Sequence, residues 1–207
     1  EKRNANRNLS YEDIAVLYRT NAQSRAFEGE LRKNNIPYRI YGGTSFYQRK
    51  EIKDTLAYFR LAVNPKDNEA LLRALTFPSR GIGDTTMKKV TLCAIENNQS
   101  YLEVMRHPDN YPLDMSGPMR KKISAFAAMI DEMAVQSEEM DAFRFAEMLL
   151  KQTGLTTALM MDRTTEGIDR AQNVQELLNA IREFVTQRAN EGIDYTPITD
   201  FLSEVSL

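Results

Sequence analysis

Beyond residue 45 the chain is a succession of amphipathic segments that end at proline, glycine or polar pairs. Ile52, Leu56, Phe59 and Val63 recur at the spacing of one helical face, and Pro65 ends that segment. Similar segments cover residues 68–77, 83–98, 119–139, 141–154 and 169–190, and a further one begins at Pro197. The pattern predicts helices throughout this part. Asp84 is the expected N-cap of one helix, and Gly154 is the expected stop of another.

The first 45 residues carry a different pattern. "DIAVLYR" (13–19) and "IPYRIYGG" (36–43) are short apolar runs typical of strands, and "NAQSRAFEGELRKNN" (21–35) between them is typical of a helix. This order predicts a strand–helix–strand unit of the parallel-sheet type, so we expect an α/β portion followed by an all-α part. Residues 107–118 contain three prolines and a glycine, which predicts a boundary there between residues 1–112 and 113–207.

Composition excludes several classes of site. Cys93 is the single cysteine and His107 the single histidine, so we expect no internal disulfide, no metal site and no histidine-based triad. No apolar run approaches the roughly 18 residues of a membrane span. A cytoplasmic location follows as the expectation. The chain begins with Glu1 rather than Met, so we expect a piece of a longer protein.

Charge is unevenly distributed along a chain whose net charge is −2. Residues 1–60 contain 12 Lys and Arg against 7 Asp and Glu, whereas the remainder contains 15 against 22. The basic first part could contact phosphate groups, or it could be an ordinary solvated face.

Tyr18 and Arg19 end the first apolar run, where a parallel sheet binds its ligands. A tyrosine there could stack on a base, and an arginine could bind phosphate oxygens. The alternative is that Tyr18 packs in the core and Arg19 pairs with an acid. The sequence contains no GxxxxGK[ST] motif, so the chain cannot by itself bind and split a nucleotide by the P-loop route.

Two glycine-containing turns are candidate DNA contacts. "SRGIGDTT" (79–86) places Gly81 and Gly83 before a helix start, where backbone N–H groups can approach phosphate. "YGGTSFYQRKEIKD" (41–54) follows Gly42-Gly43 with aromatic and basic residues that could contact bases and backbone. An ordinary capped turn and a helix with internally paired charges are the alternatives.

Three segments together resemble the UvrD/PcrA/Rep group of superfamily-one DNA helicases. They are "IAVLYRTNAQSR", "IPYRIYGGTSFYQRKEIKDTLAYFRLAVNPKD" and "PSRGIGDTT", in this order. The resemblance is close over residues 12–92 and looser beyond, where "DRAQNVQELLNAIREF" is similar to a later helical part of the family. It implies that residues 1–112 are a truncated RecA-like motor portion, called 2A, and residues 113–207 a truncated helical insertion, called 2B.

The resemblance also implies roles for particular residues. Tyr18 would stack on adenine and Arg19 would reach the γ-phosphate of ATP, which makes Arg19 the expected catalytic residue. Arg49, Glu51 and Lys53 would lie near the nucleotide cleft and the DNA path. Arg80, Gly81 and Gly83 would meet the DNA backbone.

The function implied is part of an ATP-dependent 3′-to-5′ DNA helicase in repair or replication. The longer protein would use ATP with Mg²⁺ and act on single-stranded DNA and single-strand/duplex junctions, with possible repair or replication proteins as partners. The isolated chain should be inactive because the phosphate-binding loop and the acidic metal-binding motif are absent. The alternative is a helical regulatory or protein-interaction module over residues 113–207.

Overall fold

The computed structural model of the chain describes residues 10–205, and every regular element in that range is helical. Four short 3₁₀ turns occur: η1 (Tyr11–Asp13), η2 (Asn21–Gln23), η3 (Phe46–Gln48) and η4 (Pro108–Asn110). The α-helices are α2 (Ser24–Lys33), α3 (Lys50–Val63), α4 (Asn68–Thr76), α5 (Asp84–Glu96), α6 (Tyr101–Arg106), α7 (Gly117–Glu139), α8 (Ala142–Gln152), α9 (Leu155–Met161), α10 (Thr165–Asn190) and α11 (Ile198–Val205).

The prediction of an α/β portion is wrong, because residues 10–205 contain no strand and no sheet. Strands need a neighbouring strand to pair their backbone N–H and C=O groups, and the two apolar runs have none here. The backbone at Ile14 is extended (φ −111°, ψ 122°), yet its side chain and that of Val16 are exposed, and Leu17 is 94% exposed. A RecA-like sheet is therefore absent from the described chain, and helix α2 confirms only the middle of the predicted unit.

Helix α3 is the centre of the core. Ile52, Tyr58, Phe59 and Leu61 point to different sides of this helix, and each is fully buried. A helix that is apolar on several sides must be surrounded by other elements, and α3 contacts α4, α7, α8, α10 and α11. The Tyr58 hydroxyl donates to the backbone oxygen of Ala74 at 2.6 Å, which satisfies its polar end.

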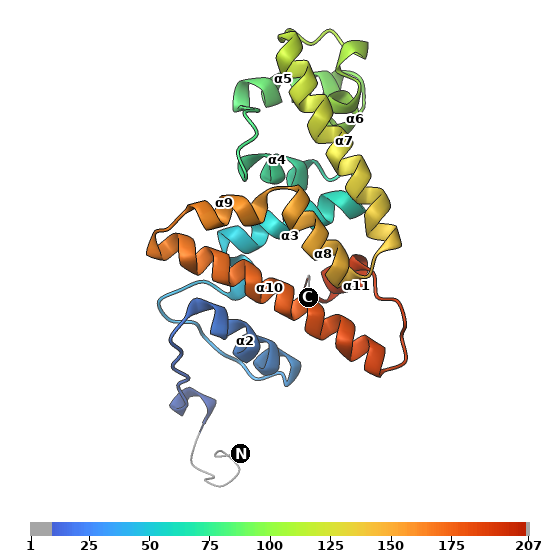
Figure 1. Cartoon of the computed structure of the whole chain (residues 1–207). Coiled ribbons are helices and arrows are strands. Elements are labelled where there is room, and N and C mark those ends of the chain that lie inside the picture. The colour runs from blue at the N-terminus through green and yellow to red at the C-terminus, as the bar shows by residue number, and fades with distance from the viewer. Residues whose placement is uncertain (1–9, 206–207) are drawn as a thin grey trace.

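Figure 1 shows how the other helices surround α3. Helices α5, α6 and part of α7 form an upper lobe, while α8, α9 and α10 lie around α3. Helix α2 lies on the side of α10 that faces away from α3, and residues 10–23 lie below α2 in this view. One buried cluster extends from Phe46 to Phe201, so the core includes residues on both sides of the predicted boundary near residue 112. The division into two domains stays a prediction.

Several helix ends follow the expected chemistry. The side chains of Ser116, Asp141 and Thr164 accept backbone N–H groups at the starts of α7, α8 and α10. Gly154 follows α8 with φ +74°, as predicted for a C-terminal stop. Asp84 is not an N-cap: Gly83 holds that position, and Asp84 is the first residue of α5. No helix within residues 10–205 has both the length and the apolar character needed to cross a bilayer.

The start of α10 depends on a glycine. A Cβ at Gly167 would come within 2.3 Å of the Asp162 backbone oxygen and 2.5 Å of its Oδ1 atom. The Gly167 amide also donates to the Thr164 hydroxyl at 3.0 Å, which holds this turn against the preceding loop. Any side chain at residue 167 therefore has to push the loop away from the helix.

We expect Gly167→Ala to lower the free energy of unfolding by about 1–3 kcal/mol, because the added methyl overlaps the backbone. Gly117→Ala is the matched control. Gly117 is also a helical residue near an N-terminus but has open space around it, so its substitution should be neutral or stabilise by up to about 1 kcal/mol. Urea unfolding of the 207-residue chain, followed by circular dichroism, measures both; equal midpoints would contradict the prediction.

Candidate nucleotide and DNA site

Tyr18 and Arg19 lie at the surface, on the segment that leads into α2. The Tyr18 side chain is 37% exposed, and its ring stacks on Phe27 of α2 with centroids 6.5 Å apart and planes 22° apart. The backbone N–H groups of Arg19 and Thr20 both donate to the side-chain oxygen of Gln23, at 2.9 and 3.2 Å. Gln23 thus fixes the turn that presents Arg19. Within residues 10–205, no ion pair joins the Arg19 guanidinium to an acidic side chain.

A cavity of about 620 Å³ opens between this segment and α10. Its apolar wall combines two aromatic rings with small alanines, and its polar groups come from one arginine, one glutamine and one glutamate. The lining residues are Leu17, Tyr18, Arg19, Ala22, Gln23, Ala26, Phe27 and Glu176. Flat aromatic walls suit a planar ring, and an arginine at the edge suits an anion.

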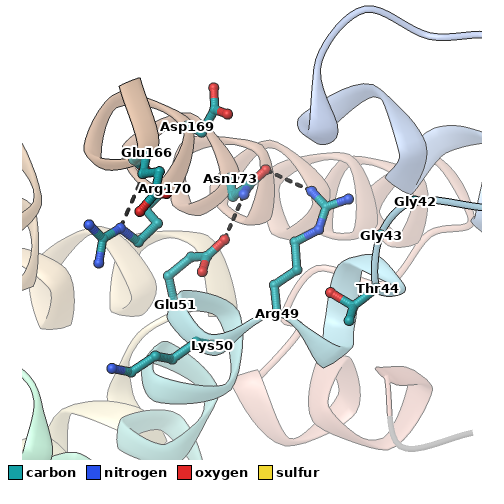
Figure 2. Close-up of a pocket in the computed structure, with 10 residues that line it drawn as sticks. All are labelled: Gly42, Gly43, Thr44, Arg49, Lys50, Glu51, Glu166, Asp169, Arg170 and Asn173. Atoms are coloured by element: carbon teal, nitrogen blue, oxygen red, sulfur yellow. Dashed lines mark hydrogen bonds between the residues drawn. The ribbon is translucent and has the colours of Figure 1, made fainter. Parts of the chain in front are cut away.

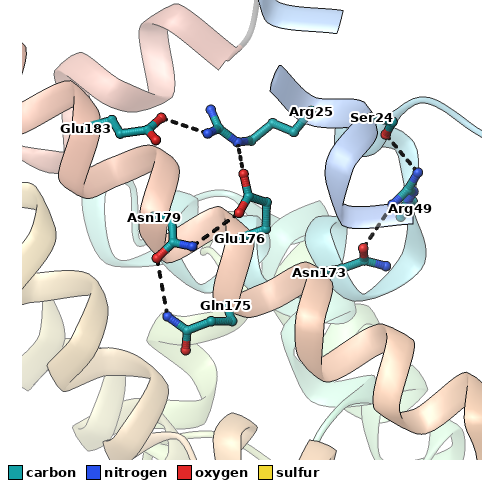
Figure 3. Close-up of polar contacts among 8 residues, drawn as sticks. All are labelled: Ser24, Arg25, Arg49, Asn173, Gln175, Glu176, Asn179 and Glu183. Carbon is teal, nitrogen blue, oxygen red and sulfur yellow. Dashed lines mark hydrogen bonds and ion pairs between the residues drawn. The ribbon is translucent and has the colours of Figure 1, made fainter. Parts of the chain in front are cut away.

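Arg25 joins α2 to α10 through two carboxylates (Figure 3). Its Nε donates to Glu176 Oε1 and its Nη2 to Glu183 Oε2, both at 2.7 Å. Burial alone would lower the pKa of Arg25, but the hydrogen bonds and charges of the two carboxylates outweigh it and raise that pKa. Glu176 and Glu183 are seven residues apart and therefore share one face of the helix.

A second polar network lies deeper in the same interface. Arg49 donates from Nη1 to Asn173 Oδ1 at 2.9 Å and from Nη2 to the Ser24 hydroxyl at 3.0 Å. Asn173 in turn donates from Nδ2 to Glu51 Oε1 at 2.6 Å. Arg49 is 8% exposed and Asn173 is 3% exposed. The network of largely buried side chains therefore connects the start of α2, the start of α3 and the first half of α10.

This network forms the floor of a smaller, more polar cavity of about 350 Å³ (Figure 2). Glycines 42 and 43 border it on one side, and Glu166, Asp169 and Arg170 of α10 border it on the other. Three cationic and three anionic side chains line it, so its charges balance. Of the candidates from this segment, Arg49 and Glu51 are buried here, while Lys53 lies half-exposed on α3.

The turn at Arg80–Gly83 connects the core to the upper lobe. Gly81 adopts φ +66°, a left-handed conformation that favours glycine. The Arg80 guanidinium points inward: Nη2 donates to the Tyr58 hydroxyl at 2.9 Å and to the Thr153 backbone oxygen at 3.0 Å. The cation that stands over the turn is Lys122 of α7, whose Nζ lies 3.0 Å from the position a Cβ would take at Gly81.

The structure therefore brings together residues that the sequence did not join. Arg25, Asn173, Glu176 and Lys122 have no place among the sequence-based candidates, although Asn173, Glu176 and Glu183 share a spacing that puts them on one helical face. Among the described residues, no group of three or more His, Cys, Asp or Glu side chains is arranged to hold a metal ion.

The family of the chain follows from its amino-acid sequence as a whole. The model of the UvrD-like helicase C-terminal domain matches residues 2–207, so the chain belongs to that family, and the resemblance seen in the sequence is confirmed.

Similar curated proteins carry the name ATP-dependent DNA helicase PcrA. The protein of Leuconostoc citreum is 36% identical over 204 residues, which is 97% of this chain and 27% of that protein. Those of Staphylococcus aureus (strain Mu50) and Staphylococcus epidermidis are 32% identical over 197 residues, covering 95% of this chain and 26% of each relative. The chain thus spans about a quarter of the length of these relatives.

We expect Asn173→Ala to lower the free energy of unfolding by about 1–3 kcal/mol, because it leaves Arg49 and Glu51 each without one buried partner. Gln175→Ala is the control on the same helix. Its exposed side chain makes only a long hydrogen bond to Asn179, so the change should stay within about 0.5 kcal/mol. Urea unfolding of the 207-residue chain measures both. Equal effects would mean that the buried network does not hold the interface.

Proposed function

We propose that the chain is part of an ATP-dependent 3′-to-5′ DNA helicase and forms one wall of its nucleotide site. The observation that carries the proposal is the pairing of the Tyr18–Phe27 aromatic wall with Arg19 at the edge of one surface cavity. The aromatic faces can stack on a base, and the guanidinium can bind phosphate oxygens. Membership of the UvrD-like helicase C-terminal domain family and relatives named as ATP-dependent DNA helicases support this assignment.

The residues present fit part of the nucleotide only. Tyr18, Phe27 and Arg19 suit the base and a terminal phosphate, whereas the described residues offer no metal site and the sequence has no P-loop. Mg²⁺ and the remaining phosphate contacts would come from other parts of the longer protein. On this view the isolated chain does not hydrolyse ATP, and Arg19 acts across a cleft by stabilising the charge on the transferred phosphate.

DNA would contact the turn that connects the core to the upper lobe. The Gly81–Gly83 turn offers backbone N–H groups, and Lys122 adds a cation beside it. Because the Arg80 and Arg49 guanidinium groups have internal partners, we propose that they hold their segments in place. Lys122 beside that turn, and separately Lys53 near the start of α3, would make the phosphate contacts.

The wider setting is also a proposal. The longer protein would translocate on single-stranded DNA and unwind junctions with duplex DNA, in the cytoplasm, during repair or replication. Repair or replication proteins would be its partners. A module that acts only through protein contacts is the alternative, and DNA-binding measurements distinguish the two.

We expect Arg19→Ala, made in the full-length protein, to lower kcat for ATP hydrolysis by at least about tenfold, because an arginine that binds the transferred phosphate typically contributes about 10³ or more. Arg39→Ala is the control, since Arg39 is an exposed arginine on the segment between α2 and η3 that lines neither cavity. DNA-stimulated ATPase rates measure both. Normal turnover in the Arg19 variant would remove this residue from the site.

We expect Lys122→Gln in the full-length protein to weaken binding to a single-strand/duplex junction and to reduce the slope of log affinity against log salt by about one, because one phosphate contact is lost. Lys151→Gln, at the exposed end of α8, should leave the slope unchanged. Fluorescence anisotropy at several salt concentrations measures this slope. Identical slopes for both variants would exclude the turn as a DNA contact.

A further inference from the structure

Glu176 is the only residue of α10 that lines the aromatic cavity within the described chain. It lies 151 positions from Arg25 and comes from the face of α10 that covers α2 (Figure 3). Both of its carboxylate oxygens are engaged: Oε1 accepts from Arg25 Nε at 2.7 Å, and Oε2 accepts from Asn179 Nδ2 at 3.1 Å. A carboxylate held in this way is fixed in direction and has little freedom to act on a ligand itself.

The contacts of Glu176 lead directly to the proposed nucleotide wall. Arg25, which it holds, lies in the first turn of α2. Gln23, one residue before that helix, accepts the backbone N–H groups of Arg19 and Thr20, and Phe27 supplies the ring on which Tyr18 stacks. The position of the first turn of α2 therefore sets where both Tyr18 and Arg19 stand.

We propose that Glu176 is a positioning residue for nucleotide binding, acting through Arg25. This inference rests on the proposed function of Tyr18 and Arg19 as a nucleotide wall. Glu176 anchors α2 to α10, and the Arg25 guanidinium neutralises its charge beside a cavity meant for an anion. Loss of the carboxylate lets the first turn of α2 shift, which separates the aromatic face from the base it stacks on.

Glu183 provides a matched comparison. It also binds Arg25, at the same 2.7 Å, but it does not line the cavity, and its side chain is 67% exposed against 22% for Glu176. Glu176→Gln and Glu183→Gln each replace one carboxylate partner of Arg25 by a neutral amide of nearly the same volume. A role in helix docking alone would make the two variants behave alike.

The test is steady-state ATP hydrolysis by the full-length protein with saturating single-stranded DNA. We expect Glu176→Gln to raise KM for ATP at least about fivefold with kcat changed less than about twofold, since a displaced binding wall weakens binding more than turnover. Glu183→Gln should change KM by less than about twofold. If Glu176→Gln lowers kcat at unchanged KM, the substitution merely reduces the folded fraction and the proposal is overturned. Equal KM values for both variants also overturn it.

A double-substitution cycle tests the route through Arg25. If Glu176 acts through Arg25, Arg25→Gln combined with Glu176→Gln should raise KM no further than the larger single effect. Additive effects overturn the route. Arg19→Ala distinguishes failure of the proposed function from failure of the Glu176 proposal. Normal turnover in the Arg19 variant would contradict the proposed function itself. If Arg19→Ala loses turnover and Glu176→Gln keeps the KM of the unmodified protein, only the proposed role of Glu176 is contradicted.

Discussion

Residues 10–45 are attached to α10 by polar contacts, and the rest of the candidate site depends on this attachment. Between residues 10 and 45, the side chains that the structure describes as buried are those of Ser24 and Glu28, so apolar packing contributes little there. Arg25 makes the connection through Glu176 and Glu183, and Arg49 makes it through Asn173 and Ser24. The contacts of Arg49 are buried, and a buried charged contact is costly to break singly because the remaining partner stays desolvated. These contacts hold the two segments together, and they also fix the orientation of the residues that line the cavity.

The sequence predicts most of the helices for a simple physical reason. Apolar residues at helical spacing, ended by Pro65, Gly154 or polar pairs, leave few other ways to bury the core. The sequence did not delimit α6 and α9 as separate segments, because six and seven residues are too short to show a clear period. The strand predictions failed where an apolar run, Ile14 to Leu17, was assumed to be buried but is exposed.

Some residues of the candidate site could be named from the sequence, and others could not. Tyr18 and Arg19 could be named from the sequence because a local motif carries them. Both line the aromatic cavity, and their role there stays a prediction. Glu176 and Asn173 could not be named from the sequence, because their partners Arg25 and Glu51 lie 151 and 122 positions away. A glutamate on a helix also usually indicates a solvated face. Arg80 and Arg49 show the reverse: both are basic residues beside glycine turns, yet both guanidinium groups are committed to internal acceptors.

The glycine at the start of α10 also limits how this helix can move. Close approach of Gly167 to the backbone of Asp162 leaves no room for the helix to travel along its own axis toward that loop. The same helix carries Asn173, Glu176 and Glu183, spread over nearly three turns against the N-terminal segment. A shift of α10 along its axis toward that loop is therefore blocked, so such a shift cannot move Asn173, Glu176 and Glu183 relative to the aromatic cavity.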